Sequence, residues 1–560
     1  MSLFAWTPRR TLLTIICLIA ASTLAFLVTP APADADDTLA GYSNYQALRD
    51  EMGKLAGNDF VTLRSLGKTL EDRDILMLTL SIGDADKKPA IALVGNVDAG
   101  HLLGSELAMQ VARQLAEQID EPEIASLLKR FTIYVIPRPS PDASEKCFAL
   151  PRRRPVGNSR QTDDDRDHKR GEDPPEDLNG DGLITMMRVA DVTGPYRRHP
   201  HDPRVLVRAD RTKGEKGEFQ LYIEGVDNDG DGKWNEDAGD GVAFNRNFTF
   251  NYPYFGANAG PHQISERETR AVGDFLFNQT NIAAVVTFTP DDNLAHHWKP
   301  GKNPPRMQKY IDAGDLGYVK ALIDPLRKRL GLQGAPAAKA GAGSFSEWAY
   351  FHYGRWSLAT RGWTIPPSES KKKNAGPGQA DLEALAWMDA NDVNGFVDWQ
   401  PIEHVDFPGQ QVEIGGFKPF VRDNPPAAKL DELGARQLDL IKSVLDSMPK
   451  ISIHKTDIKS LGAGVYRVKA TVVNEGRWPT SSEMGRRSRG IHRVQVALDL
   501  PEGAELIRGP IRTQLPVIVG SGGKAEHTWL LRVDEEKPKQ TTIRAWAPAV
   551  GEDQVEIELK

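Results

Sequence analysis

The chain has 560 residues, of which 40% are hydrophobic and 26% are charged, so it can bury a large core and wholesale disorder is excluded. The net charge of −7, from 70 basic and 77 acidic residues, gives no general reason to bind nucleic acid or an anionic membrane. With only Cys17 and Cys147, a disulfide-stapled scaffold and a cysteine-based zinc finger are excluded as well.

The N-terminus has the pattern of a secretory signal peptide over residues 1–35. Arg9 and Arg10 precede an apolar run over 11–28, and small residues with an A-x-A-like site follow at 33–35. This pattern predicts a secreted or periplasmic protein that has no membrane contact after cleavage. The alternative is an uncleaved membrane anchor, because an apolar run of about 18 residues nearly spans a bilayer.

Residues 42–448 mix buried strand-like runs with amphipathic helices. The runs 90–94, 131–136 and 282–288 predict strands, and 106–119 predicts a helix. Ser265–Glu268 reads as a capping box that opens a further helix, which extends to about Phe277. Strands that alternate with helices indicate an α/β sheet with helices on its faces.

The sequence pattern of residues 451–560 differs from that of the preceding segment, because helical periodicity is absent. Short runs rich in β-branched and aromatic residues are separated by glycine-containing turns, which is typical of an all-β sandwich. The predicted strands cover 465–473, 494–498, 529–533 and 541–547. We expect this segment to be a non-catalytic accessory domain.

A polar segment at about 155–243 carries three acidic loops with related spacing. Oxygen ligands at alternate positions, with glycine at a sharp turn, are what calcium requires. The second loop is the strongest candidate, since it has both the turn glycine Gly232 and a distal acid, although that acid comes too early for an EF-hand. The alternative is a set of solvated acidic turns. The candidate ligands are Asp163, Asp165, Asp167 and Glu172 in the first loop, Asp227, Asp229, Asp231 and Glu236 in the second, and Asp177, Asn179 and Asp181 in the third.

Four motifs follow in a characteristic order along residues 42–448. They are Gly95–Glu106 after a predicted strand, Ser140–Asp142, the Asn-Arg-Asn-Phe run at Asn245–Phe248, and Gly343–Tyr350. This order resembles the carboxypeptidase A-type zinc metallopeptidase family, and the Asn-Arg-Asn-Phe run is its most specific element. The resemblance implies a three-layer α/β/α fold with a mixed, largely eight-stranded sheet. The acidic segment is then an insertion before Asn245.

The resemblance also implies a zinc site with the ligands His-x-x-Glu and a later His, and here the pattern is altered. Asp98 takes the first ligand position and His101 the second, giving Asp-x-x-His, which can still bind zinc. Thr289 stands at the third position and is a poor neutral donor. Nearby residues that could replace it after a local shift are Asp291, Asp292, His296 and His297. The alternatives to metal binding are that Asp98 caps the following helix and that His101 is a polar residue at the start of this helix whose hydrogen bonds are made within the protein.

The resemblance, counted without gaps from Glu347 and Trp348, places the family's catalytic glutamate at Arg361. Arginine cannot accept a proton at neutral pH, and its charge repels a metal. Asn245 and Arg246 are intact, so the resemblance implies a surviving site for the C-terminal carboxylate of a peptide, held by Arg246 in a bidentate contact. The alternative is that Arg246 pairs with a nearby acid and is structural.

Two functions remain open at this point. One is a pseudoenzyme that recognises the free C-terminus of a peptide or a peptidoglycan stem, with lost or altered hydrolysis. The other is an active metallocarboxypeptidase or amidohydrolase that uses a rearranged Asp98–His101 zinc site. The cofactors expected are calcium in the acidic loops and, for the second function, zinc.

Overall fold

The computed structural model describes residues 38–163, 168–235, 239–301, 309–366, 376–534 and 540–559. The predicted signal peptide, residues 1–35, lies outside this part of the chain. Among the residues that are described, every helix is too short or too polar to cross a bilayer.

A mixed sheet with the strand order β1-β2-β4-β3-β9-β10 forms the centre of the molecule. Strands β4, β3, β9 and β10 are parallel, whereas β1 and β2 add an antiparallel edge. The runs 90–94, 131–136 and 282–288 form β3, β4 and β9, as predicted. The strands are β1 (Val61–Lys68), β2 (Asp74–Leu80), β3 (Ala90–Val94), β4 (Thr132–Ile136), β9 (Ile282–Phe288) and β10 (Trp356–Thr360).

Helices cover both faces of this sheet. Alternate strand residues point to opposite sides, so Leu93 joins the apolar cluster under α2 and α9, and Val94 joins the cluster under α5 and α7. The predicted three-layer α/β/α fold is therefore confirmed. The helices of this part are α1 (Tyr45–Leu55), α2 (Leu102–Glu117), α3 (Pro122–Arg130), α4 (Pro141–Glu145), α5 (Arg267–Asn278), α6 (Ala313–Ile323), α7 (Phe345–Phe351) and α9 (Leu430–Ser447).

Two expectations about this sheet need correction. The described residues form a six-stranded central sheet, not one of about eight strands, and β10 is its edge. The capping box is also not formed: α5 has Glu266 at its N-cap, and the buried Glu268 side chain accepts a hydrogen bond from Asn158 instead of reaching back to the helix start.

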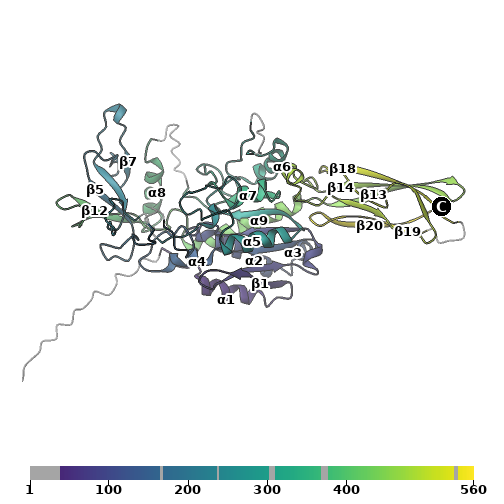
Figure 1. Cartoon of the computed structure of the whole chain (residues 1–560), viewed down its shortest axis with the longest axis horizontal. Coiled ribbons are helices and arrows are strands. Elements are labelled where there is room, and N and C mark those ends of the chain that lie inside the picture. Colours follow the sequence, from purple (N-terminus) through teal and green to yellow (C-terminus); the bar gives the residue numbers. More distant parts are fainter. Residues whose placement is uncertain are drawn as a thin grey trace, which may run out of the picture.

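The acidic insertion contains a second sheet that the sequence did not reveal. Its strands are β5 (Met186–Ala190), β6 (Tyr196–Arg198), β7 (Leu206–Arg208) and β8 (Phe219–Ile223), joined by β11 (Phe396–Ile402) and β12 (Val412–Phe417). Their order is β11-β12-β5-β8-β6-β7. Helix α8 (Gln379–Ala390) lies beside this insertion sheet at one end of the molecule (Figure 1).

The C-terminal segment forms two four-stranded antiparallel sheets around one apolar cluster, as a β-sandwich requires. One sheet holds β13 (Ile451–Gly462), β14 (Val465–Asn474), β18 (Gly523–Arg532) and β16 (Glu505–Arg508). The other holds β17 (Arg512–Gln514), β15 (Gln495–Leu498), β19 (Gln540–Ala547) and β20 (Gly551–Glu558). The short helix α10 (Glu483–Ser488) was not predicted.

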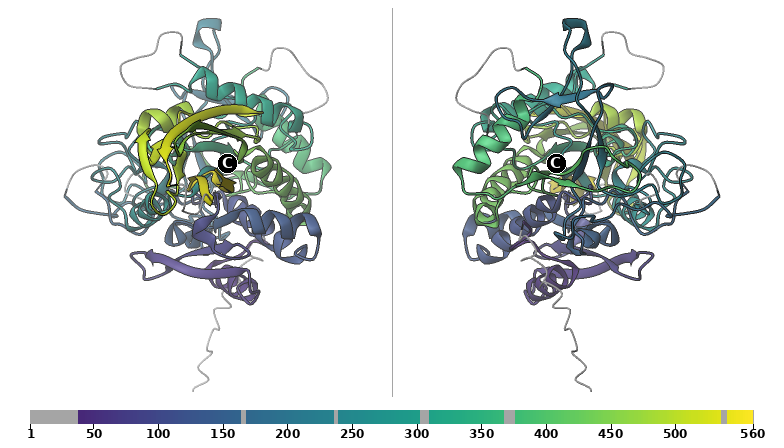
Figure 2. Two further views of the ribbon diagram at one scale, coloured as in Figure 1. Left: turned by 90° about the vertical axis from the view of Figure 1, so that its right-hand side faces the viewer. Right: turned by 90° about the vertical axis from the view of Figure 1, so that its left-hand side faces the viewer.

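The sandwich packs against the central domain at the end opposite the insertion sheet (Figure 1). Trp478 stacks on Trp356 with ring centroids 4.7 Å apart. The buried Asp315 carboxylate accepts hydrogen bonds from the backbone N–H groups of Glu483 and Met484, at 2.8 and 3.2 Å, at the start of α10. Viewed end-on, α1 and β1 lie along one edge of the molecule (Figure 2).

Candidate functional site

Three neighbouring parallel strands bring the predicted site residues to one edge of the central sheet. Strand β9 pairs in parallel with β3 on one side and with β10 on the other. The carboxyl ends of the three strands therefore lie at the same edge of the sheet. Asp98 follows β3, Thr289 follows β9 and Arg361 follows β10. The Thr289 hydroxyl donates to Asp98 Oδ2 at 2.7 Å. The first and third ligand positions implied by the resemblance therefore do meet.

The Asp98 carboxylate is held by an amide as well as by this hydroxyl. Asn245 Nδ2 lies 3.1 and 3.2 Å from the two oxygens of Asp98 and 3.2 Å from Asp291 Oδ2. The orientation of the amide follows from its other end, because Asn245 Oδ1 accepts a hydrogen bond from Phe345 N at 2.9 Å. One side-chain amide thus bridges two carboxylates, and Asp98 does not cap α2, whose N-cap residue is His101.

The Asp291 carboxyl has a raised pKa. Burial, and after it the charge of Asp98, raises the pKa of Asp291 to about 7. Burial also raises the pKa of the nearby Glu347 carboxyl, on α7, to about 7. In the sequence, Glu347 stood out only as a member of the Gly343–Tyr350 motif. Its raised pKa follows from the burial of α7, which the sequence did not reveal.

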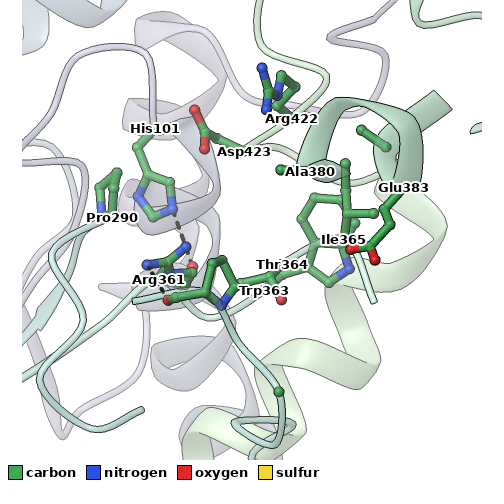
Figure 3. Close-up of a pocket in the computed structure, with 13 residues that line it drawn as sticks. His101, Pro290, Arg361, Trp363, Thr364, Ile365, Ala380, Glu383, Arg422 and Asp423 are labelled. Atoms are coloured by element: carbon green, nitrogen blue, oxygen red, sulfur yellow. Dashed lines mark hydrogen bonds between the residues drawn. The ribbon is translucent and has the colours of Figure 1, made fainter. Parts of the chain in front are cut away.

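His101 is 1% exposed and turns toward the end of β10. Its Nε2 lies 3.2 Å from the carbonyl oxygen of Arg361. A carbonyl only accepts hydrogen bonds, so Nε2 carries the proton and Nδ1 keeps a lone pair, which has no partner among the described residues. Burial lowers the pKa of His101, which favours the neutral imidazole. His101 lines a cavity of about 230 Å³ together with Arg361, Trp363 and Asp423 (Figure 3).

The donor groups at these strand ends do not match the zinc ligands that the resemblance implies. Zinc in such a site takes three protein ligands. In the described parts of the chain, the ligand atoms of three or more His, Cys, Asp or Glu side chains converge within 4.8 Å only at Asp227, Asp229 and Asp231. Among the described residues, Asp98 and His101 therefore have no third ligand of these types.

Of the four nearby replacements, Asp291 lies at the site and shares the Asn245 amide with Asp98, whereas the other three are engaged elsewhere. His296 Nε2 lies 2.8 Å from the carbonyl oxygen of Ala335, and His297 Nε2 lies 3.1 Å from Asp324 Oδ1. Asp292 Oδ1 accepts hydrogen bonds from the backbone of residues 294 and 295. These contacts give the three side chains structural roles.

Arg361 occupies the position at which the resemblance places a general base. Its Nη2 donates to the carbonyl oxygen of Pro336 at 3.2 Å, and its Nε lies 4.0 Å from Asp292 Oδ2. In Figure 3 the guanidinium lies below His101, and Asp423 lies on the other side of the imidazole. Asp423 pairs with Arg154, and no sequence pattern pointed to it, because it is far along the chain in a loop.

Arg246 ends a short 3-10 turn, Phe244–Arg246, and is half-buried. Within the described residues its guanidinium forms no hydrogen bond or ion pair with another side chain. Pairing with a nearby acid is thus not observed, and its five N–H donors are available to a ligand. Asn245, by contrast, uses both ends of its amide inside the protein.

Two of the acidic loops have the same backbone conformation. Asp227 accepts hydrogen bonds from the N–H groups of Gly230, Asp231 and Gly232, and Asp177 accepts the equivalent three in the other loop. The last glycine of each loop has a φ of +86° or +83°, which requires glycine. The repeat seen in the sequence is therefore a structural repeat.

The structure describes only some of the remaining predicted calcium ligands. Asp163 Oδ2 accepts a hydrogen bond from His168 N at 3.2 Å, and Asn179 donates to Asp181 at 3.2 Å. Glu172 is half-buried. Asp165, Asp167 and Glu236 lie outside the described residues.

Comparison with known protein families shows which sequence profiles the chain matches. Residues 49–365, more than half of the chain, match the sequence profile described as zinc carboxypeptidase. The chain belongs to the zinc carboxypeptidase family. Residues 450–558 match a profile described as a domain of unknown function (DUF8731).

Curated relatives within the zinc carboxypeptidase family match over short stretches. Carboxypeptidase A4 of Mus musculus is 32% identical over 111 residues, which are 19% of this chain and 26% of that protein. A zinc carboxypeptidase of Saccharothrix mutabilis subsp. capreolus is 29% identical over 114 residues, which are 20% of this chain and 26% of that protein. The matches thus span about a quarter of these relatives.

Solved structures of the family also align with the chain. Bovine thrombin-activatable fibrinolysis inhibitor, in complex with tick carboxypeptidase inhibitor, aligns with a TM-score of 0.37 and 10% identity, over 72% of this chain and 96% of that one. Carboxypeptidase A from Helicoverpa armigera aligns with a TM-score of 0.36 and 13% identity, over 63% and 73%.

Proposed function

We propose that this zinc carboxypeptidase family member is exported and binds the C-terminal carboxylate of a peptide or peptidoglycan stem, with hydrolysis lost or altered. The observation that carries the proposal is the bonding of Asp98. Its carboxylate is held by the Thr289 hydroxyl and the Asn245 amide, so neutral hydrogen-bond donors contact both of its oxygens.

The binding half of the proposal depends on Arg246. A half-buried guanidinium that has no partner among the described residues is suited to a carboxylate, because two parallel N–H groups can reach both of its oxygens. The Asn245 side chain, which was predicted to share this task, instead positions Asp98 and Asp291. We therefore assign contact with the carboxylate to Arg246 and a positioning role to Asn245.

The catalytic half of the proposal depends on Arg361 and Thr289. An arginine cannot remove a proton from water, and a threonine hydroxyl does not complete a zinc site. Both substitutions lie at strand ends where a water molecule would have to be activated. Ordinary metal-assisted hydrolysis is therefore not supported by these residues.

Metal content tests the catalytic half. We expect mature protein, purified without chelator or affinity metal, to contain far less than one zinc per chain by elemental mass spectrometry. About one zinc per chain, lost together with any peptidase activity on treatment with chelator, would favour the alternative of an active enzyme with a rearranged Asp98–His101 site.

We further propose that the acidic loops bind calcium and thereby fix the insertion. The carboxylates of Asp227, Asp229 and Asp231 converge, and mutual repulsion of such groups is relieved by a cation. Although the hydrogen bond from the backbone N–H of Asp231 lowers it, desolvation and then the neighbouring carboxylates of Asp231 and Asp227 raise the pKa of Asp229 above its ordinary value.

Calcium is accordingly expected to raise the melting temperature of the protein by a few degrees, since a ligand at about 100 times its Kd adds about 2.7 kcal/mol. The variants Asp229→Ala and Asp231→Ala should reduce this rise, as followed by differential scanning calorimetry. Asp191→Ala, which removes an acid of the insertion outside the loops, is the control. A melting temperature that does not respond to calcium or EDTA would contradict the calcium proposal.

The remaining parts of the proposal concern location and partners. The signal-peptide pattern of residues 1–35 supports a secreted or periplasmic location, with membrane anchoring as the alternative. The net charge of −7 supports the absence of a nucleic acid partner. The β-sandwich is then an accessory domain that makes contacts outside the binding site.

A further inference from the structure

A cleft of about 690 Å³ lies between the insertion sheet and the central domain. One wall comes from the insertion and from the end of β12, and the other from loops at 153–156 and 257–258 of the central domain. A cleft of this size falls within the range of about 300–1,000 Å³ that holds small organic ligands, which often bind where two structural units meet. Arg246 is not among the residues that line it.

The walls of this cleft are mainly apolar. Its lining includes Ile184, Met186, Ile223 and Phe417. Ile223, the last residue of β8, remains 45% exposed, and Val156 on the opposite wall remains 44% exposed. These side chains leave apolar surface in contact with water, and an apolar ligand would remove it from water.

The same cleft carries an excess of positive charge. Arg153, Arg154 and Arg422 line it, whereas Asp240 is its one acidic lining residue. Arg153 pairs with Asp240 at 2.6 Å, Arg154 pairs with Asp423, and Arg422 pairs with Asp381 at 2.7 Å. The last two acids do not line the cleft.

The three guanidinium groups also keep hydrogen-bonding capacity. Each has five N–H donors, and the ion pairs use only a part of them. A carboxylate can therefore be added to this group of arginines without breaking an existing pair. Because the surroundings are apolar, such a contact is less screened than one at the open surface.

We propose that this cleft binds an apolar molecule that carries one carboxylate, with the apolar part against Ile223 and Phe417 and the carboxylate at the arginines. The inference goes beyond the proposed function, because it concerns a second site that Arg246 does not reach. Arg422 also lines the cavity at His101, so a ligand in the cleft lies beside the strand-end site (Figure 3).

The test is calorimetric titration of the full mature chain with octanoate and with N-acetyl-Leu-Phe, which represent a fatty acid and a peptide C-terminus. Binding of octanoate, together with much weaker binding of octan-1-ol, is the expected result. Binding of N-acetyl-Leu-Phe, with much weaker binding of its amide, supports the cleft only if it survives Arg246→Ala. Binding of octanoate would indicate a fatty acid as the ligand, and binding of N-acetyl-Leu-Phe would indicate a peptide C-terminus. No binding of either carboxylate, or equal binding of the uncharged compounds, would overturn the proposal.

A matched pair of variants locates the binding. Ile223→Glu places a negative charge in the cleft at a side chain that is already half-exposed, so like-charge repulsion should weaken carboxylate binding at least about tenfold. Val192→Glu makes the same chemical change at an 88% exposed position of the insertion, outside the cleft, and should leave binding unchanged. Equal affinities of the two variants would place the ligand elsewhere.

Arg246→Ala separates this inference from the proposed function. Octanoate binding should survive that substitution, even if binding of peptide C-termini at the strand-end site does not. A loss of octanoate binding in Arg246→Ala would show that the carboxylate binds at Arg246 and not in the cleft.

Discussion

Replacing Arg246 by alanine is expected to weaken the binding of peptides with a free C-terminus by about 10- to 150-fold. This range corresponds to the about 1.5–3 kcal/mol that a hydrogen bond to a charged group contributes. The side chain has no protein partner among the described residues, so its removal leaves no buried acid unpaired. Isothermal titration calorimetry with a short peptide and its C-terminal amide measures the effect directly.

Two controls sharpen this experiment. The amide should bind the unaltered protein about as weakly as the free acid binds Arg246→Ala, because both changes remove the same ion pair. Arg270→Ala removes an exposed arginine from α5 and should change nothing. Unchanged binding of the free acid in Arg246→Ala would refute the assignment of Arg246 to the carboxylate.

Restoring the ligand types of the family is expected to raise the zinc content from the proposed value of far less than one to about one zinc per chain. The variant combines Asp98→His, His101→Glu and Thr289→His with Arg361→Glu, which also removes the positive charge beside the site. The Asp98 and Thr289 side chains already touch at 2.7 Å, so histidines at these positions begin close together. Elemental mass spectrometry and the zinc dependence of the melting temperature report the outcome.

The same variant without Thr289→His is the appropriate comparison. It supplies only the first two of the three ligand positions that the family pattern gives, and a third protein ligand is what a zinc site of this kind requires. We expect it to lose zinc on dialysis against a weak chelator under conditions in which the full variant retains it. A full variant that folds but holds no zinc would show that Asp98, His101 and Thr289 do not occupy the metal-ligand positions.

The placement of these residues was predictable because it depends on strand direction. Asp98, Thr289 and Arg361 each follow a buried apolar run, and parallel strands bring such positions to one edge of a sheet. The amide bridge from Asn245 to Asp98 and Asp291 could not be predicted. It joins a turn to two strand ends that lie 147 and 46 residues away along the chain, and no local pattern encodes such a contact.

The insertion sheet escaped prediction for a related reason. Strands β6 and β7 have three residues each, which is too short for an alternating pattern to stand out. Strand β5 finds one partner in β12, where Val189 faces Val412 from a distant part of the chain. The sequence indicated the loops of the insertion through their glycines and acids, because those signals are local.

The contacts of Asp315 and Trp478 have a consequence for how the molecule meets its surroundings. They attach the β-sandwich to the central domain through a buried carboxylate and a stacked indole pair, and not through a free linker. The sandwich and the insertion sheet lie at opposite ends of the molecule (Figure 1). Any surface to which the sandwich attaches therefore also sets the direction in which the strand-end site faces and its distance from that surface.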